Sequence, residues 1–382
     1  MSTLKVDTIR NYDSAVDFSQ GFNIGGASII QNYTESADMP ETPTPVNGDY
    51  WWDTANNVLY RYMDGGFRAL GTTAPVLYYG DRGLRFGGYK TGVDYSNVID
   101  YWDITSAGNA TDFGDLTLKR NYVASCSNTS RAVSMGGAST QNGDGTIYTA
   151  YGTNIIDYVT IATTGNATDF GDLLTRKSRA ASESNGIRAI HGGGITGDSG
   201  AYANTIEYIT IANTGNSTDF GDLTVTRERL SAASNGSRIV FVGGNDAPNY
   251  YNTMDYVTGD TTGNATDFGD MTNQVSNMGA TGTGTGDRAI IFGGNASNYI
   301  NVIQYFAVST TGNAADFGDC LGNDSYASAC CNSTKAQFVG GYRSADLNII
   351  QEVTMSTLGN ATDFGDLTEA VYSSGATSGN PS

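Results

Sequence analysis

The stretch GNATDFGDL, residues 108–116, decides how this chain folds, because near-copies of it return five more times. The six copies begin at Gly108, Gly165, Gly215, Gly263, Gly312 and Gly359. A basic residue stands five positions before a Gly-Gly pair in each repeat, and these residues are Arg82, Arg131, Arg188, Arg238, Arg288 and Lys335. An N-x-[IM]-x string begins eleven residues before every copy of the motif. Three markers at a period near fifty residues indicate six structural repeats.

Each repeat predicts four short strands, which we name a to d in chain order. Strand a is a segment of Ala, Ser, Gly and Cys, whose small side chains fit the crowded axis of a ring. Strand b runs from the basic residue to Gly-Gly, and strand c alternates apolar and polar residues, as in NTIEYITIA (204–212). Strand d is placed after the GNATDFGD turn, in segments such as LTVTR (223–227). Four strands in each of six repeats predict an all-β, six-bladed β-propeller.

The two ends of the repeat region complement each other. The first repeat begins at its basic residue, Arg82, and lacks a strand a before it. The usual spacing of twenty-three residues, counted from Gly359, reaches residue 382, where the next basic residue would stand. We therefore expect the C-terminal strand to complete the first blade and close the ring.

Composition excludes several classes of partner and chemistry. The 382 residues include 20 Lys and Arg against 39 Asp and Glu, a net charge of −19, which argues against nucleic-acid binding. There is no run of 18 apolar residues, so we expect no membrane insertion. His191 is the only histidine, which argues against a His-based catalytic triad or a His-rich zinc site. We expect no catalytic residues and no cofactor.

The Asn and Asp residues of GNATDFGD leave two interpretations open. In the first copy they are Asn109, Asp112 and Asp115, and oxygen ligands of this kind bind calcium. The favoured interpretation is a set of Asx turns, in which these side chains accept hydrogen bonds from nearby backbone N–H groups. We therefore predict no metal site.

Residues 76–382 resemble a kelch-type propeller. The resemblance lies in the hydrophobic strand that ends in Gly-Gly and in the following strand with its Asn-x-Ile-Asp-Tyr core. The tryptophan that kelch repeats carry on strand d is missing here. We expect the phenylalanine of each DFGD string to take its packing role, and these residues are Phe113, Phe170, Phe220, Phe268, Phe317 and Phe364.

Residues 1–75 do not repeat. The strings MSTLKVDTIRN (1–11) and PVNGDYWWDTANNVLYRYMDGGFRAL (45–70) resemble tail fibres and other virion proteins of tailed phages, especially cyanobacterial phages. We divide this part into a virion-attachment arm, 1–34, and a linker with a small β-hairpin module, 35–75. Trp51, Trp52 and Phe67 are its expected packing anchors.

The resemblance implies a protein on the phage tail or capsid exterior, and a tail fibre or host-recognition protein is the leading interpretation. Residues 1–75 would then contact other virion proteins, and the chain would form a homotrimer. Two alternatives stay open: a purely structural component, such as a capsid decoration or baseplate protein, and a glycan-acting propeller enzyme. We expect no enzyme, because no repeat carries a complete set of acid, base and nucleophile.

The loops between strands b and c vary in length and content, whereas the turns on the opposite face repeat. Recognition loops are expected to diverge in this way, because a receptor does not share the symmetry of the ring. These loops carry the candidate receptor-binding residues Tyr89, Tyr95, Tyr148, Tyr151, Tyr202, Tyr250, Tyr251, Tyr299 and Tyr342. Tyrosine among small polar residues suits recognition, and a cell-surface glycan is the leading candidate receptor.

Overall fold

The computed structural model describes residues 80–139, 152–197, 199–282 and 287–380, and the backbone of five strands before residue 73. The chain divides into two compact units, Met1–Ala74 and Pro75–Ser382. In the first unit β1 (Asn23–Ile24) pairs with β2 (Ala27–Ser28), while β3 (Tyr50–Asp53), β4 (Val58–Met63) and β5 (Gly66–Thr72) form an antiparallel sheet. A third strand thus joins the expected hairpin. Trp51 and Trp52 lie on β3 and Phe67 on β5, and their side-chain packing lies outside the described residues.

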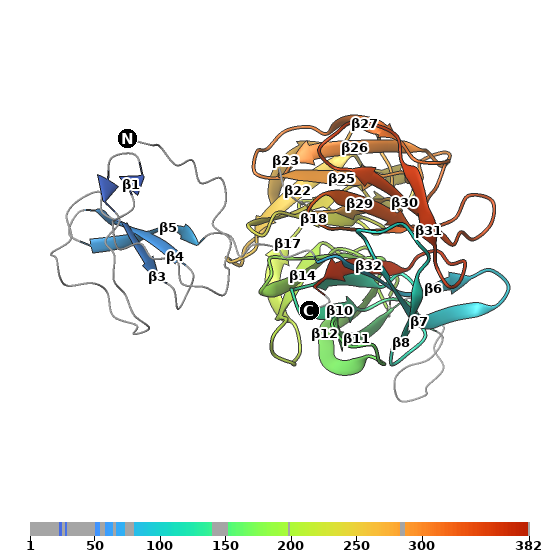
Figure 1. Ribbon diagram of the computed structural model, residues 1–382. Helices are drawn as coiled ribbons and strands as arrows, with labels where there is room; N and C mark the ends of the chain where they lie inside the picture. The colour runs from blue at the N-terminus through green and yellow to red at the C-terminus, as the bar shows by residue number, and fades with distance from the viewer. Residues whose placement is uncertain are drawn as a thin grey trace. The chain divides into compact units, whose positions relative to one another are not determined.

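The second unit is a six-bladed β-propeller, as predicted (Figure 1). Blade 1 contains β6 (Arg82–Lys90), β7 (Asp94–Asp103), β8 (Thr111–Asp115) and β32 (Gly375–Gly379), and blade 2 contains β9 (Ala124–Ser127), β10 (Arg131–Met135), β11 (Thr153–Thr160) and β12 (Thr168–Ser178). Blade 3 contains β13 (Ala181–Ser184), β14 (Arg188–Gly192), β16 (Thr205–Thr210) and β17 (Thr218–Asp222), and blade 4 contains β18 (Ser231–Ser234), β19 (Arg238–Val242), β22 (Thr253–Thr258) and β23 (Thr266–Asp270). Blade 5 contains β24 (Gly279–Thr281), β25 (Arg288–Phe292), β26 (Val302–Ala307) and β27 (Ala315–Asp319), and blade 6 contains β28 (Ser328–Cys331), β29 (Lys335–Val339), β30 (Ile349–Thr354) and β31 (Thr362–Asp366). Two short additions lie between strands b and c: β15 (Ile195–Thr196), and the pair β20 (Asn245–Asp246) and β21 (Asn249–Tyr250).

The predicted position of strand d was wrong in five blades, whereas in blade 2 the strand β12 contains both the TDFGD string and the segment predicted as strand d. The outermost strand is the TDFGD string itself, so that β17 pairs with β16 from Thr205↔Asp222 to Tyr208↔Thr218. Only the residues before it, such as Gly215 and Asn216, form the turn after strand c. The LTVTR segment instead leads into the next blade and buries Arg227. This segment has the alternating pattern of a strand because Leu223 and Arg227 at its two ends are both buried, while Thr224 and Thr226 are exposed.

The C-terminal strand closes the ring, as predicted. β32 is the innermost strand of blade 1 and pairs with β6 from Gly375↔Phe86 to Gly379↔Arg82. The first and last parts of the repeat region therefore share one sheet, and they lie side by side in Figure 1. In the described part of the chain, no helix is long and apolar enough to span a membrane.

The GNATDFGD motif joins each blade to the next at the outer rim. The N–H of Gly165 donates to the carbonyl of Phe113 at 2.8 Å, and the N–H of Asp115 donates to Oδ1 of Asn166 at 3.1 Å. The same asparagine bond recurs at all six junctions, including the one from Asp366 to Asn109. The Asx-turn interpretation expected the asparagine to accept a hydrogen bond within its own turn. Instead, the asparagine accepts a hydrogen bond from the neighbouring blade. Each edge strand is thereby covered, which blunts its tendency to pair with other chains.

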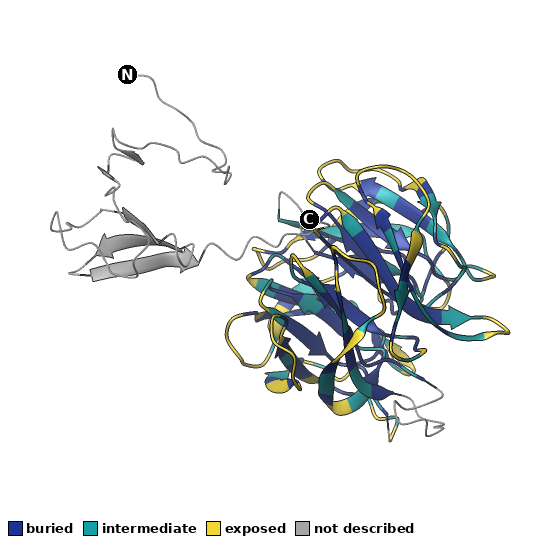
Figure 2. Cartoon of the chain, turned by 60° about the horizontal axis from the view of Figure 1, so that its bottom comes forward, coloured by how far each residue is buried: buried dark blue, intermediate teal, exposed yellow. Residues whose placement is uncertain are grey.

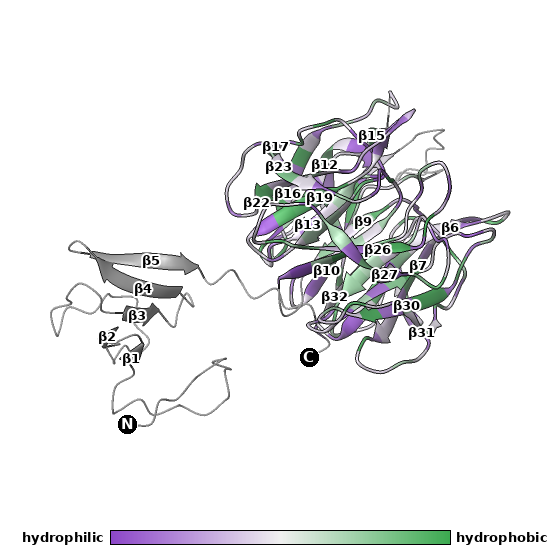
Figure 3. Ribbon diagram, turned by 90° about the horizontal axis from the view of Figure 1, so that it is seen from above, coloured by the Kyte–Doolittle hydropathy of each residue, from purple (hydrophilic) through white to green (hydrophobic). Residues whose placement is uncertain are grey.

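Aromatic and cationic side chains pack between strands b, c and d. The ring of Phe220 is buried and meets Tyr208 edge-to-face at 5.8 Å, so the phenylalanine of DFGD lies in the core. The guanidinium of Arg188, at the start of strand b, lies over the ring of Tyr208, 4.5 Å from the ring centre. Buried residues fill the blades in Figure 2 while exposed residues follow the loops, and Figure 3 shows hydrophobic stretches along β26 and β30.

Buried charges also tie neighbouring segments together. Strand c carries a buried acid or amide at one position of each blade: Asp100, Asp157, Glu207, Asp255, Gln304 and Gln351. The segment that enters the blade supplies a cation in three pairs, Arg120–Asp157, Lys177–Glu207 and Arg227–Asp255. In blade 5 the entering segment has Val275 instead of a cation, and strand c has the neutral Gln304. In blade 1 the entering segment has Val371, and Asp100 pairs with Arg85 of its own blade. Each of the four buried carboxylates on strand c thus has a cationic partner, as burial requires.

Candidate functional site

Six backbone hydrogen bonds form a closed circle around the propeller axis. The N–H of each residue just before strand a donates to the carbonyl of the equivalent residue in the preceding blade, at 2.6–3.3 Å. In chain order these residues are Tyr122, Arg179, Arg229, Asn277, Tyr326 and Ser373, and the circle is completed from Tyr122 back to Ser373. We call them the axial ring. It lies on the face that also carries the loops between strands b and c, because each of its residues follows strand d and precedes strand a.

All six axial-ring residues have a positive φ, between 50° and 60°. This left-handed conformation favours glycine and is unfavourable for residues with a Cβ. The chain nevertheless places a glycine in none of these six positions, and the side chains differ from blade to blade. The left-handed conformation recurs in every blade together with the circle of backbone hydrogen bonds, whereas the side chain at this position varies, as expected for a recognition surface.

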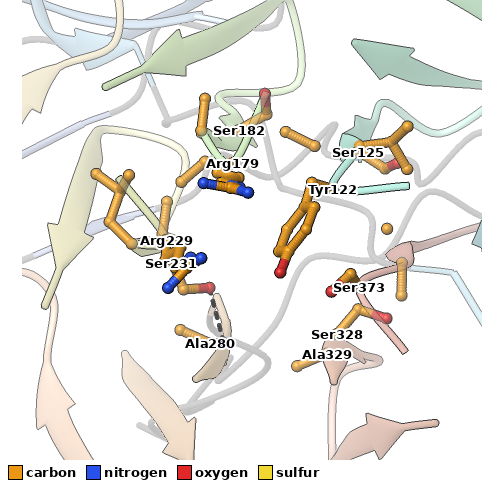
Figure 4. A pocket seen from close by; sticks show the side chains of 18 of the residues that line it. Tyr122, Ser125, Arg179, Ser182, Arg229, Ser231, Ala280, Ser328, Ala329 and Ser373 are labelled. Carbon is orange, nitrogen blue, oxygen red and sulfur yellow. Dashed lines mark hydrogen bonds between the residues drawn. The ribbon is translucent and has the colours of Figure 1, made fainter. Parts of the chain in front are cut away.

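The axial ring surrounds the mouth of a cavity of about 110 Å³. Below the ring the wall is formed by small residues of strand a, among them Ala124, Ser182 and Ser231. Figure 4 shows the guanidinium groups of Arg179 and Arg229 and the hydroxyl of Tyr122 reaching into this space. The cavity has room for several water molecules and is lined by both polar and apolar groups.

A tyrosine cluster begins at the axial ring and extends over one side of the same face. It contains seven rings joined by edge-to-face contacts with centroid distances of 5.3–6.5 Å: Tyr89, Tyr95, Tyr122, Tyr299, Tyr326, Tyr342 and Tyr372. Each of these residues is half-buried, so part of every ring stays accessible. Burial, together with the nearby phenols of Tyr122 and Tyr89 and the carboxylate of Asp346, raises the pKa of Tyr372 to about 12, which keeps its hydroxyl protonated at neutral pH.

The cluster contains four of the nine tyrosines predicted to bind a receptor. Tyr89, Tyr95, Tyr299 and Tyr342 belong to it, and Tyr148 and Tyr151 lie outside the described residues. The three others have different surroundings. The hydroxyl of Tyr202 accepts a hydrogen bond from the N–H of Ala247, Tyr250 ends the short hairpin of β20 and β21, and the hydroxyl of Tyr251 bonds Asp246.

Sequence reasoning missed Tyr122, Tyr326 and Tyr372, together with the rest of the axial ring. A signal for the ring was present, because each of its residues stands fourteen positions after the first glycine of GNATDFGDL, as Tyr122 does after Gly108. The alternating pattern of the segment before strand a predicts a strand, and this pattern hides the one residue that varies from repeat to repeat. A position that varies inside an otherwise regular repeat is the pattern that identified the b–c loops.

Two arginines of the axial ring share one buried carboxylate. Nη1 of Arg179 lies 2.9 Å from Glu228, and Nε of Arg229 lies 3.4 Å from the other oxygen of the same group. Burial lowers the pKa of Arg179, but the hydrogen bond and charge of Glu228 outweigh this and raise it. The guanidinium of Arg179 also lies over the ring of Tyr122, at 4.9 Å from its centre. Cationic and aromatic groups therefore meet at the cavity mouth.

Two other titratable groups lie near the axis. Burial raises the pKa of Glu183, on the cavity wall, to about 8, although its carboxylate accepts the N–H of Ser184 at 3.0 Å. His191 is buried and lies 2.8 Å from Oγ of Ser182 through Nδ1. Burial lowers its pKa to about 4, and the nearby Glu207 only partly offsets this, so the ring is neutral and a weak proton acceptor at pH 7.

Among the described residues, no group of three or more His, Cys, Asp and Glu side chains is arranged to hold a metal ion. The four cysteines are buried and unpaired. No model of a known protein family matches the chain, and no curated protein matches it. The site is therefore interpreted from its own geometry.

Proposed function

We propose that this chain is a host-recognition protein of a phage virion, whose propeller binds a glycan on the cell surface. The tyrosine cluster carries the proposal. Its seven half-buried rings form a connected aromatic surface beside a polar cavity, and stacking of sugar rings on aromatic faces is a common mode of glycan binding. Tyrosine supplies this contact area with little loss of side-chain entropy.

The virion part of the proposal rests on residues 1–75, whose strings resemble phage tail-fibre and other virion proteins. In this proposal they attach the propeller to other virion proteins as a homotrimer on the particle exterior. The mass of the purified full chain in solution tests the trimer, and a monomeric mass contradicts it.

Binding of the labelled full chain to intact candidate host cells tests the recognition proposal. The test variant replaces Tyr89, Tyr299 and Tyr342 by Ala, and the matched control replaces Tyr202, Tyr250 and Tyr251 by Ala. We expect saturable binding to fall at least tenfold for the first variant and to change less than threefold for the control. Periodate oxidation of the cell-surface sugars should remove binding of the unchanged protein.

Equal binding of both folded variants contradicts the assignment to the cluster. A folded protein that binds no host cell favours the alternative of a purely structural virion component.

A further inference from the structure

The cavity mouth carries a local positive charge in a strongly acidic chain. Arg179 and Arg229 contribute two cations, and Glu228 contributes one anion between them, so this group has a net charge of 2 − 1 = +1. Their side chains are 21% and 25% exposed, and that of Glu228 is 4% exposed. The chain as a whole has a net charge of −19. The axial ring therefore offers an anion a local excess of positive charge on this face.

Several polar groups on the cavity wall have unused hydrogen-bonding capacity. Nε of Arg179 is buried with no hydrogen-bond partner among the described residues, as are the hydroxyls of Ser125 and Ser373. All three residues line the same cavity. Buried polar groups in folded proteins nearly always have partners, so these groups are available to the oxygen atoms of water or of a ligand.

Aromatic and cationic groups adjoin at this point. Arg179 lies over Tyr122, whose ring lies 6.5 Å from that of Tyr326 inside the tyrosine cluster. A ligand with an apolar face next to an anionic group would match both the cluster and the mouth. The net charge of +1 matches one carboxylate better than a phosphate dianion, and the planar fork of arginine matches the two oxygens of a carboxylate.

We propose that the axial ring is a subsite for the carboxylate of an acidic sugar, a hexuronic or nonulosonic acid, within the receptor glycan. The inference rests on the proposed function and specifies its ligand class. Arg179 and Arg229 bind the carboxylate, the cluster stacks on the sugar ring, and the serine hydroxyls contact its oxygens. The raised pKa of Glu183 is consistent with this, because it favours the uncharged form of the side chain and so reduces repulsion at the cavity wall.

The test compares acidic sugars with their neutral counterparts on the full chain. The probes are glucuronate, galacturonate, mannuronate and N-acetylneuraminate, with glucose, galactose, mannose and N-acetylmannosamine as neutral controls and glucose 6-phosphate as a dianion. Binding is followed by saturation-transfer NMR and calorimetry at pH 7. We expect at least one acidic sugar to bind tenfold or more tightly than its neutral counterpart, and glucose 6-phosphate to bind more weakly than that sugar.

The variant R179Q/R229Q should abolish this preference. Lys119→Gln is the control for a change of charge, because Lys119 is 57% exposed and lies outside the cavity wall. Thermal unfolding of each variant verifies the fold. A preference that survives in R179Q/R229Q overturns the inference, and so does equal affinity for acidic and neutral sugars. If acidic and neutral sugars bind equally but cell binding still depends on the tyrosines, the proposed function stands and only this inference fails. If the preference for acidic sugars and the dependence of cell binding on the tyrosines are both absent, both proposals are contradicted.

Discussion

Gly365 in the last blade lies directly against Gly108 in the first: a Cβ added to Gly365 would stand 2.2 Å from the carbonyl oxygen of Gly108. Equivalent glycines meet at the five other junctions, as Gly221 does with Gly263. The motif therefore closes the ring at the outer rim, while β32 closes it at the axis. Neighbouring blades approach so closely there that a side chain on the second glycine of the motif would displace the backbone of the next blade.

Replacement of Gly221 by Ala should destabilise the propeller by about 2–4 kcal/mol, because the new Cβ would lie 2.3 Å from the Gly263 carbonyl and φ is +149°. Gly263→Ala is the matched control, since nothing lies within 4 Å of its Cβ position, and it should change stability by less than about 1 kcal/mol. Chemical denaturation of both variants measures the difference. Equal stabilities would show that the junction relaxes freely.

The buried ion pair of Arg227 and Asp255 should be replaceable by the uncharged pair of residues that blade 5 has at the same positions, Val275 and Gln304. Arg227→Val alone leaves the buried Asp255 without its cation and should cost about 3–5 kcal/mol. The double variant R227V/D255Q reproduces Val275 and Gln304 and should recover most of this loss. A double-mutant cycle by urea unfolding measures the coupling between the two positions. Additive effects would contradict a direct pairing.

Glu183 should make the protein less stable as the pH rises. Its pKa is about 8 in the folded state, against 4.5 for an ordinary Glu, so folding favours the protonated form. The stabilisation is complete below pH 4.5 and is lost between pH 4.5 and 8. Glu183→Gln removes this dependence. The difference in free energy of unfolding between the variant and the unchanged protein should therefore shift in favour of the variant by about 1–3 kcal/mol from pH 5 to pH 8. Thermal unfolding across this range tests it, and parallel pH profiles would show that Glu183 titrates normally.

His191 should act in the opposite direction. Its pKa of about 4 lies below the ordinary 6.5, so the folded state favours the neutral ring. Stability from this group is complete above pH 6.5 and is lost as the pH falls from 6.5 to 4. His191→Asn, which retains an amide near the Nδ1 position facing Ser182, should flatten the acid side of the stability profile. If the slope between pH 4 and 6.5 stays unchanged, other groups cause it.

Repetition made the architecture readable from the sequence. The spacing from Asn204 to Gly215, and from there to Arg238, is nearly constant across repeats, and each interval corresponds to strands and turns that form locally. A strand b that ends in Gly-Gly and a strand c with alternating residues therefore follow from local pattern. The outer strand was misplaced because TDFGD contains two aspartates and a glycine, which are rare in strands. Its pairing is stabilised by Asn264 of the next blade, and a local pattern does not contain that contact.

The sequence by itself determined the number of blades and the order of their strands, because these depend on intervals between residues near one another in the chain. It also determined the closure of the ring, because the first repeat lacks the strand that the last residues supply. Only the tertiary structure decided which side chains meet at the axis. Arg179 and Tyr122 stand 57 residues apart, and Tyr89 and Tyr372 stand 283 apart, yet each pair is in contact. Closing six blades into a circle brings one residue of every repeat to the same small circumference. The physical chemistry of that place depends on all six residues together, and no single repeat contains it.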